Sequence, residues 1–141
     1  DIAKVKPDVF NHNLETVPRI YKQIRPGSNY LESLKLLREV KEFDKTIFTK
    51  SGIMIGLGED YSEIIEVLKD MKNSNIDFVT IGQYLQPSIH HEKVHKFYSP
   101  DEFKSLYNYC LKIGFKMISS SPMTRSSYHA DEDFEKLKKA I

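Results

Sequence analysis

The feature that most constrains the fold is the stretch from Thr49 to Glu59, where an apolar run passes into a glycine-rich turn. Its apolar residues show no polar alternation, which is typical of a strand covered on both faces in a parallel sheet; they are Ile53, Met54, Ile55 and Leu57. Three glycines in the same stretch, Gly52, Gly56 and Gly58, allow a bulky group to lie against the backbone. The stretch therefore predicts a buried strand that ends at a ligand.

A helix is expected directly after this turn, because apolar residues recur at helical spacing from Ser62 to about Asn73. Strand, turn and helix form half of a βαβ unit, whose ligand side is the carboxyl end of the strand. A tight strand-to-helix turn that only needs small residues explains the glycines equally well at this point. The spacing is not Gly-x-Gly-x-x-Gly and no Gly-Lys-Ser/Thr follows, so a Walker-type nucleotide loop is excluded.

The composition fits one compact unit, since 141 residues with 40% hydrophobic content are enough to bury a core. Lys and Arg total 21 against 20 for Asp and Glu, with the signs interspersed, so no polybasic face argues for nucleic acid. No apolar run reaches the length of a membrane span, and no signal-peptide segment opens the sequence. We expect a soluble protein without nucleic-acid or membrane partners, not secreted, and cytoplasmic, or mitochondrial or plastid if the source is eukaryotic.

The single cysteine, Cys110, cannot form an intramolecular disulfide. It lies at helical spacing with Phe103 and Leu106, so we expect it in the core rather than at a catalytic site. The segment from Val5 to Phe10 already has the pattern of a strand without a polar lead-in. This indicates that the sequence begins inside a domain and is a fragment of a longer chain.

Hydrogen-bonding side chains follow a strand expected at about Val9 to Asn11. They converge at its carboxyl end, which favours a ligand site there; they are Asn11, His12, Asn13 and Glu15. An Asx-rich turn that stabilises itself is the alternative.

The remaining elements alternate between helix and strand, which implies parallel pairing through right-handed crossovers. We expect a short helix from Val17, a helix capped by Asn29 that runs from Tyr30 to about Phe43, a strand over Ile76–Gln83, a helix capped by Ser99 that ends at Gly114, a strand over Phe115–Ile118, a serine-rich loop with Arg125 and Tyr128, and a short helix after Asp131.

The loop before Ser99 contains His91, Glu92 and His95, which match the His-Glu-x-x-His pattern of zinc peptidases. Such a site needs these residues inside a helix, together with a third zinc ligand downstream. Pro87 and Pro100 restrict any helix here to a few turns, and no His-x-x-Gly-x-x-His continuation follows. We interpret the segment as an exposed loop and keep the zinc peptidase as a minor alternative.

Four stretches together resemble signature segments of lipoyl synthase. They are DVFNHNLETVP (8–18), TKSGIMIGLGE (49–59), IGQYLQPS (81–88) and RSSYHAD (125–131), and the last is the most specific. The resemblance covers nearly the whole chain and implies a radical S-adenosylmethionine enzyme. Such an enzyme inserts two sulfur atoms into an octanoyl chain carried by a lipoyl-domain protein, for example the E2 subunit of a 2-oxoacid dehydrogenase or the glycine cleavage H protein.

The fold implied by the resemblance is α/β, the C-terminal half of a partial (βα)6 TIM-like barrel of the radical S-adenosylmethionine type. Residues 1–118 would form βα units of the barrel, and residues 119–141 a C-terminal loop and tail helix. The family holds two 4Fe-4S clusters on two cysteine triplets, none of which is in this sequence. Because the single cysteine cannot replace them, the chain alone is expected to be inactive.

The resemblance also implies roles for individual residues. Asn13 and Glu15 would face the ribose of S-adenosylmethionine. Gly52 to Glu59, Gly56 included, would pack against its adenosyl part. Lys50 and Gln83 would also bind the cofactor, with Gln83 at the barrel mouth. Ser127 would ligate an iron of the auxiliary cluster, with Ser126 as the alternative, and Asn11, His12, Arg125 and Tyr128 would lie on the substrate side.

Two function classes stay open on this basis. In the first, the chain is the C-terminal half of the enzyme. In the second, it is a non-catalytic module that docks the lipoyl-domain protein or the octanoyl chain.

Overall fold

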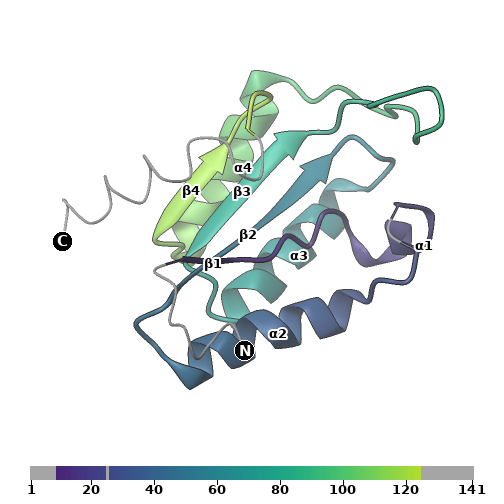
Figure 1. Cartoon of the computed structure of the whole chain (residues 1–141). Coiled ribbons are helices and arrows are strands. Elements are labelled where there is room, and N and C mark those ends of the chain that lie inside the picture. Colours follow the sequence, from purple (N-terminus) through teal and green to yellow (C-terminus); the bar gives the residue numbers. More distant parts are fainter. Residues whose placement is uncertain (1–8, 25, 125–141) are drawn as a thin grey trace.

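The computed structural model describes residues 9–24 and 26–124. The chain alternates strands and helices within these ranges, as Figure 1 shows. The elements are β1 (Val9–Asn11), the 3-10 helix η2 (Pro18–Ile20), α1 (Tyr21–Ile24), α2 (Tyr30–Phe43), β2 (Phe48–Ile55), α3 (Tyr61–Asn73), β3 (Phe78–Gln83), α4 (Pro100–Ile113) and β4 (Met117–Ser120).

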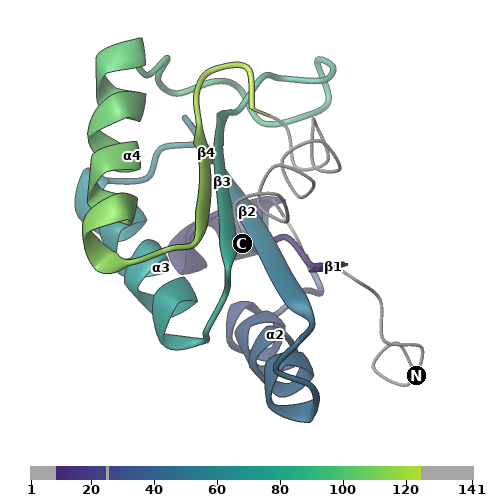
Figure 2. The same cartoon turned by 90° about the vertical axis from the view of Figure 1, so that its left-hand side faces the viewer.

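The strands form one four-stranded sheet in the order β1-β2-β3-β4, and all three pairings are parallel. Each crossover between neighbouring strands contains a helix, and α2, α3 and α4 lie on the same side of the sheet (Figure 2). The predicted alternation and the parallel pairing are confirmed. The carboxyl ends of the strands therefore meet at one edge of the sheet.

The two faces of the sheet differ in chemistry, because side chains alternate between faces along each strand. Toward the helices, the central strands place apolar side chains in the main core; these are Ile53, Ile55, Val79 and Ile81. The residues between them on the opposite face are small or polar; these are Gly52 and Met54 of β2 and Thr80 and Gly82 of β3. Both sets are aligned across the sheet, since Gly52 pairs with Thr80 and Ile53 with Ile81.

The helix ends follow the signals in the sequence. The Asn29 side chain accepts a hydrogen bond of 3.1 Å from Glu32 N, and Ser99 forms a capping box with Glu102 in front of Pro100. Gly114 ends α4 in the left-handed conformation, with φ of 99°. These predicted boundaries are confirmed.

Three strands begin at other residues than predicted, and the third of the sheet begins at Phe78 rather than Ile76. The fourth strand begins at Met117 rather than Phe115, because Phe115 N still bonds Cys110 O at the end of α4. The second strand begins at Phe48, ahead of the apolar run that starts at Ile53, so that Gly52 lies inside it. The early part of the predicted Val5–Phe10 strand and the helix predicted after Asp131 lie outside the described residues.

None of the described helices has the length and apolar character that crossing a bilayer requires.

Candidate functional site

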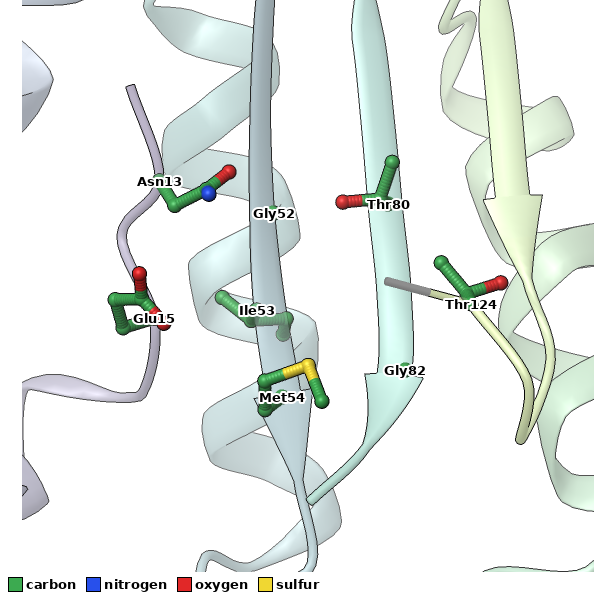
Figure 3. A pocket seen from close by; sticks show the side chains of 8 residues that line it. All are labelled: Asn13, Glu15, Gly52, Ile53, Met54, Thr80, Gly82 and Thr124. Atoms are coloured by element: carbon green, nitrogen blue, oxygen red, sulfur yellow. The ribbon is translucent and has the colours of Figure 1, made fainter. Parts of the chain in front are cut away.

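A cavity of about 200 Å³ opens on the sheet face away from the helices, toward the carboxyl ends of β2 and β3. Figure 3 shows the side chains around it. They come from the segment after β1, from the two central strands and from the loop after β4; the lining residues are Asn13, Glu15, Gly52, Ile53, Met54, Thr80, Gly82 and Thr124. Two of the residues implied for the ribose and one of the predicted glycines are thus brought together.

Asn13 and Glu15 reach the cavity through an irregular continuation of β1. His12 N bonds Lys50 O at 3.1 Å, and Glu15 N bonds Gly52 O at 3.0 Å. Between these two hydrogen bonds the first segment advances by three residues, whereas β2 advances by two. One extra residue in one strand is the geometry of a β-bulge. Glu15 has a φ of 76°, in the left-handed region that non-glycine residues seldom adopt. A bulge and a strained residue at a cavity rim are typical of functional sites.

Leu14 fixes this bulge from the helix side of the sheet. Its side chain is fully buried in the core. Its N–H donates to Ser51 Oγ at 3.2 Å, and its carbonyl accepts a hydrogen bond from the Tyr21 hydroxyl. Both polar groups of the Leu14 backbone are thus satisfied inside the protein. The flanking Asn13 and Glu15 are left to line the cavity.

The cavity floor combines missing side chains with buried oxygens. A Cβ at position 52 would lie 2.0 Å from Thr80 Oγ1 and 3.4 Å from Asn13 Oδ1, so the Thr80 hydroxyl fills the space that the missing side chain leaves, and Asn13 Oδ1 lies beside it. Asn13 Oδ1 is buried and has no hydrogen-bond partner. Buried polar atoms are usually paired, so an orphaned oxygen beside a cavity indicates a place for a ligand donor.

Met54 belongs to the stretch implied for the adenosyl part, whereas Thr80, Gly82 and Thr124 line the cavity without having been predicted from the sequence. In β3 the signal was present, because Thr80 and Gly82 alternate with the core residues Val79 and Ile81. A period of two would have placed them on the face opposite the core. Thr124 joins the cavity only through the fold of the loop after β4, for which the sequence has no comparable pattern.

Gly56 and Glu59 lie at the same edge of the sheet but do not line the cavity. The buried Glu59 carboxylate accepts hydrogen bonds from Gly56 N at 2.9 Å, Leu57 N at 3.0 Å and the Tyr98 hydroxyl at 2.8 Å. Burial, followed by the hydrogen bond to Glu59, raises the pKa of Tyr98 above its usual range. The turn after β2 thus encloses a carboxylate of its own chain.

Gln83 has a similar structural setting. Its Nε2 donates to Lys96 O at 2.9 Å, and its Oε1 accepts from Tyr98 N at 2.9 Å. A Cβ at position 56 would lie 2.4 Å from Gln83 Nε2 and 2.6 Å from Lys96 O. Gly56, with a φ of 112°, therefore gives room to the loop between β3 and α4 rather than to the cavity.

The other implied site residues are spread around the same sheet face or beyond it. Lys50 is buried, and its Nζ lies 5.0 Å from the centre of the Phe78 ring. It precedes Gly52 by two residues, so it shares the cavity's face but not its lining. His12 Nε2 contacts Ser33 Oγ at 3.0 Å, and Asn11 is exposed. Arg125, Ser126, Ser127 and Tyr128 lie outside the described residues.

The His-Glu-x-x-His segment is not helical, as expected for a loop. His95 N bonds Gly56 O at 2.7 Å, His95 Nε2 lies 3.1 Å from the Glu92 carboxylate, and His91 Nδ1 lies 2.8 Å from Ser88 Oγ. The helical condition for a zinc peptidase is therefore not met. Within residues 9–24 and 26–124, no three His, Cys, Asp or Glu side chains come together as a metal site.

Cys110 is fully buried in the core, as predicted. Burial raises the pKa of its thiol to about 12. At neutral pH it is a protonated core side chain rather than a thiolate ligand or nucleophile.

No protein-family model matches the chain. Its fold is similar to the crystal structure of SuiB from Streptococcus suis, with a TM-score of 0.61 and 13% sequence identity. The match covers 87% of this chain and 29% of that protein, so the chain spans less than a third of its structural neighbour. At this identity the likeness concerns the fold alone: an α/β domain with a parallel sheet and helices on one face.

Proposed function

We propose that this chain is the C-terminal half of a lipoyl synthase and contributes the adenosyl side of an S-adenosylmethionine site. The observation that carries the proposal is the cavity above Gly52, where Asn13 and Glu15 arrive together from the bulge after β1. An amide oxygen beside a carboxylate suits the hydroxyl groups of a ribose. The sequence resemblance implies the same ligand for the same residues.

The barrel part of the proposal rests on the sheet. Four parallel strands with helices on one side leave the second face for a polar interior, as in a section of a βα barrel. Ligands bind in such folds at the carboxyl ends of the strands, where the cavity opens. In the proposed assembly, further strands of the parent protein complete the interior.

The cavity fits the nucleoside part of S-adenosylmethionine, because the orphaned Asn13 Oδ1 needs a donor and the Glu15 carboxylate lines the same cavity. When bound, S-adenosylmethionine supplies the radical chemistry of the reaction. The residues of this chain bind and orient it: Asn13 and Glu15 hold the ribose, and Ser51 and Tyr21 hold the bulge that presents them. A fixed ribose orients the sulfonium group toward the remainder of the site.

The described residues do not fit an iron–sulfur cluster. Cluster ligation needs thiolates, whereas Cys110 is buried in the core with a raised thiol pKa. We therefore assign both 4Fe-4S clusters to the parent protein outside the described residues. Ser127 is the proposed ligand from this chain. The proposed substrate is an octanoylated lipoyl-domain protein.

The test uses the full-length protein that carries this chain, reconstituted with iron and sulfide and supplied with S-adenosylmethionine, a reductant and an octanoylated lipoyl-domain peptide. We expect 5′-deoxyadenosine and the dithiolated peptide, measured by mass spectrometry. Asn13→Ala should lower both products about tenfold or more, because one ligand hydrogen bond is lost. Asn108→Ala, at an exposed position of α4, is the matched control and should leave both unchanged.

Two outcomes would contradict the proposal. The first is the absence of S-adenosylmethionine cleavage by the reconstituted protein. The second is full activity in Asn13→Ala, which would remove the cavity from the reaction. Cleavage of S-adenosylmethionine without formation of the dithiolated peptide would instead support the proposed cofactor and contradict the proposed substrate.

A further inference from the structure

Thr80 is a polar residue of the cavity floor to which neither the sequence nor the resemblance gives a role. It lies in the middle of β3, is 4% exposed, and lines the cavity from the face opposite the core. Within the described ranges, no group hydrogen-bonds its hydroxyl. The hydroxyl of this cavity-lining residue can therefore bond a ligand in the cavity.

A second oxygen lies across the same small space. Thr80 Oγ1 lies 2.0 Å from the position that a Cβ of residue 52 would occupy, and Asn13 Oδ1 lies 3.4 Å from the same position, so the two oxygens are neighbours over Gly52. The Asn13 oxygen is itself buried without a partner. One ligand atom in the cavity beside Gly52 can therefore reach both oxygens at once.

The chemistry of the two groups selects the ligand atom. The amide oxygen of Asn13 only accepts a hydrogen bond, whereas the Thr80 hydroxyl both donates and accepts. A ligand hydroxyl satisfies the pair, because it can donate to Asn13 and accept from Thr80. A methylene in its place would leave both oxygens unpaired in a buried site, and such sites reject analogues that lack the hydroxyl.

We propose that Thr80 is a ligand-binding and specificity-determining residue, whose hydroxyl and Asn13 Oδ1 together bind one hydroxyl group of the ligand in the cavity beside Gly52. The inference deepens the proposed function, on which it rests: the bound group is one of the two ribose hydroxyls of the adenosyl ligand. Gly52 is required because an added methyl group would meet the Thr80 hydroxyl at 2.0 Å.

The test compares adenosine, 2′-deoxyadenosine and 3′-deoxyadenosine as probes for the 141-residue chain, with affinities from NMR titrations. The unmodified chain should bind adenosine about tenfold more tightly than one of the two deoxy compounds, the value of one buried hydrogen-bonded hydroxyl. In Thr80→Val, which keeps the shape and the strand propensity, that ratio should fall close to one. Thr80→Ser restores the hydroxyl and should restore the ratio.

Two further variants keep the result interpretable. Gly52→Ala retains Thr80 but displaces its hydroxyl, so it should also abolish the discrimination. Ser120→Ala removes a hydroxyl of the helix-facing side, which donates to Phe103 O at 2.8 Å, and should leave the ratio unchanged. Thr80→Ala serves if the valine variant is not folded by circular dichroism.

The possible failures are distinct. A folded Thr80→Val that still prefers adenosine by the same ratio overturns the role of Thr80 and leaves the proposed function intact. Equal binding of all three probes by the unmodified chain also rejects the shared hydroxyl subsite alone. Failure of the unmodified chain to bind any probe overturns both this inference and the assignment of the cavity to a nucleoside.

Discussion

At the scale of single residues, Asp77 is a buried charge that joins several elements. Its side chain is 4% exposed and accepts hydrogen bonds from Lys41 Nζ of α2 and, at 2.9 Å, from Thr49 N of β2. Its backbone oxygen accepts from Met117 N of β4 at 3.1 Å. Lys116 Nζ lies 3.3 Å from the carboxylate, but the Lys116 side chain is 65% exposed. Lys41 is therefore the cation whose pairing with Asp77 is screened least by water.

We predict that Asp77→Ala lowers the free energy of unfolding by about 3–5 kcal/mol, because it leaves the largely buried Lys41 ammonium without its partner. Lys116→Ala removes the exposed partner of the same carboxylate and should cost no more than about 1 kcal/mol. Urea denaturation followed by circular dichroism measures both. Equal costs for the two variants would show that burial does not set the strength of this network.

The site could be predicted from the sequence only for residues whose position follows from strand order. Asn13, Glu15 and Gly52 belong to the resemblance; the first two follow the carboxyl end of β1, Gly52 lies within β2, and all three meet in the cavity. Gly56, Glu59 and Gln83 lie at the same edge, but they bind the loop before α4. The difference depends on which side chain fills the space beside each glycine. That space is a tertiary property without a local pattern in the sequence.

At the scale of elements, the turn after β2 is built around Glu59. The carboxylate accepts hydrogen bonds from two backbone N–H groups of the turn and from the hydroxyl of Tyr98, which lies in the loop just before α4. Charge-assisted hydrogen bonds of this kind are stronger than neutral ones. The turn and the loop before α4 are thus coupled through one buried side chain.

We predict that Glu59→Gln destabilises this edge of the sheet, because an amide NH2 cannot accept the hydrogen bonds that the second carboxylate oxygen accepts. The free energy of unfolding should fall by about 1–3 kcal/mol. Hydrogen exchange at the Gly56 and Leu57 amides should accelerate more than exchange in the middle of β2. Glu66→Gln, in which the exposed Glu66 side chain of α3 is altered, is the control and should change neither measurement.

The existence and order of the elements could be predicted because local signals agree with the tertiary structure. Asn29, Ser99 and Gly114 end their helices as their side chains or their lack of one dictate. The start of β4 was displaced because Phe115 is apolar and strand-like in sequence, yet its N–H completes the end of α4. A hydrogen bond that closes a helix overrode the hydrophobic pattern.

At the scale of the whole molecule, the sheet is one-sided. Helices cover the face that carries Ile53 and Val79, whereas the opposite face carries the cavity (Figure 2). The sheet also has two edge strands, because β1 and β4 each pair with one strand among the described residues. Outer strands of this kind present unpaired N–H and C=O groups that can pair with another chain.

The two edge strands differ in how well they are protected against pairing with another chain. β1 has three residues and runs into the bulge at Asn13, and a bulge ends regular pairing. β4 has four residues and keeps a regular register with β3 from Met117 to Ser120. We therefore expect the edge of β4 to be the one at which a second chain adds.

The expected outcome is concentration-dependent association of the 141-residue chain through β4, measured by sedimentation velocity. Met117 N and Ser121 N bond β3 at Asp77 O and Ile81 O, so the alternation of a parallel strand directs the N–H of Ile118 away from β3. Ile118→Pro removes this outward donor without removing a bond to β3, and proline is tolerated at such edge positions. The variant should sediment as a monomer, whereas Ile118→Val, which keeps the N–H, should associate like the unmodified chain. Association that persists in a folded Ile118→Pro variant would show that the interface lies on another surface. An unmodified chain that stays monomeric at all concentrations would contradict association through β4.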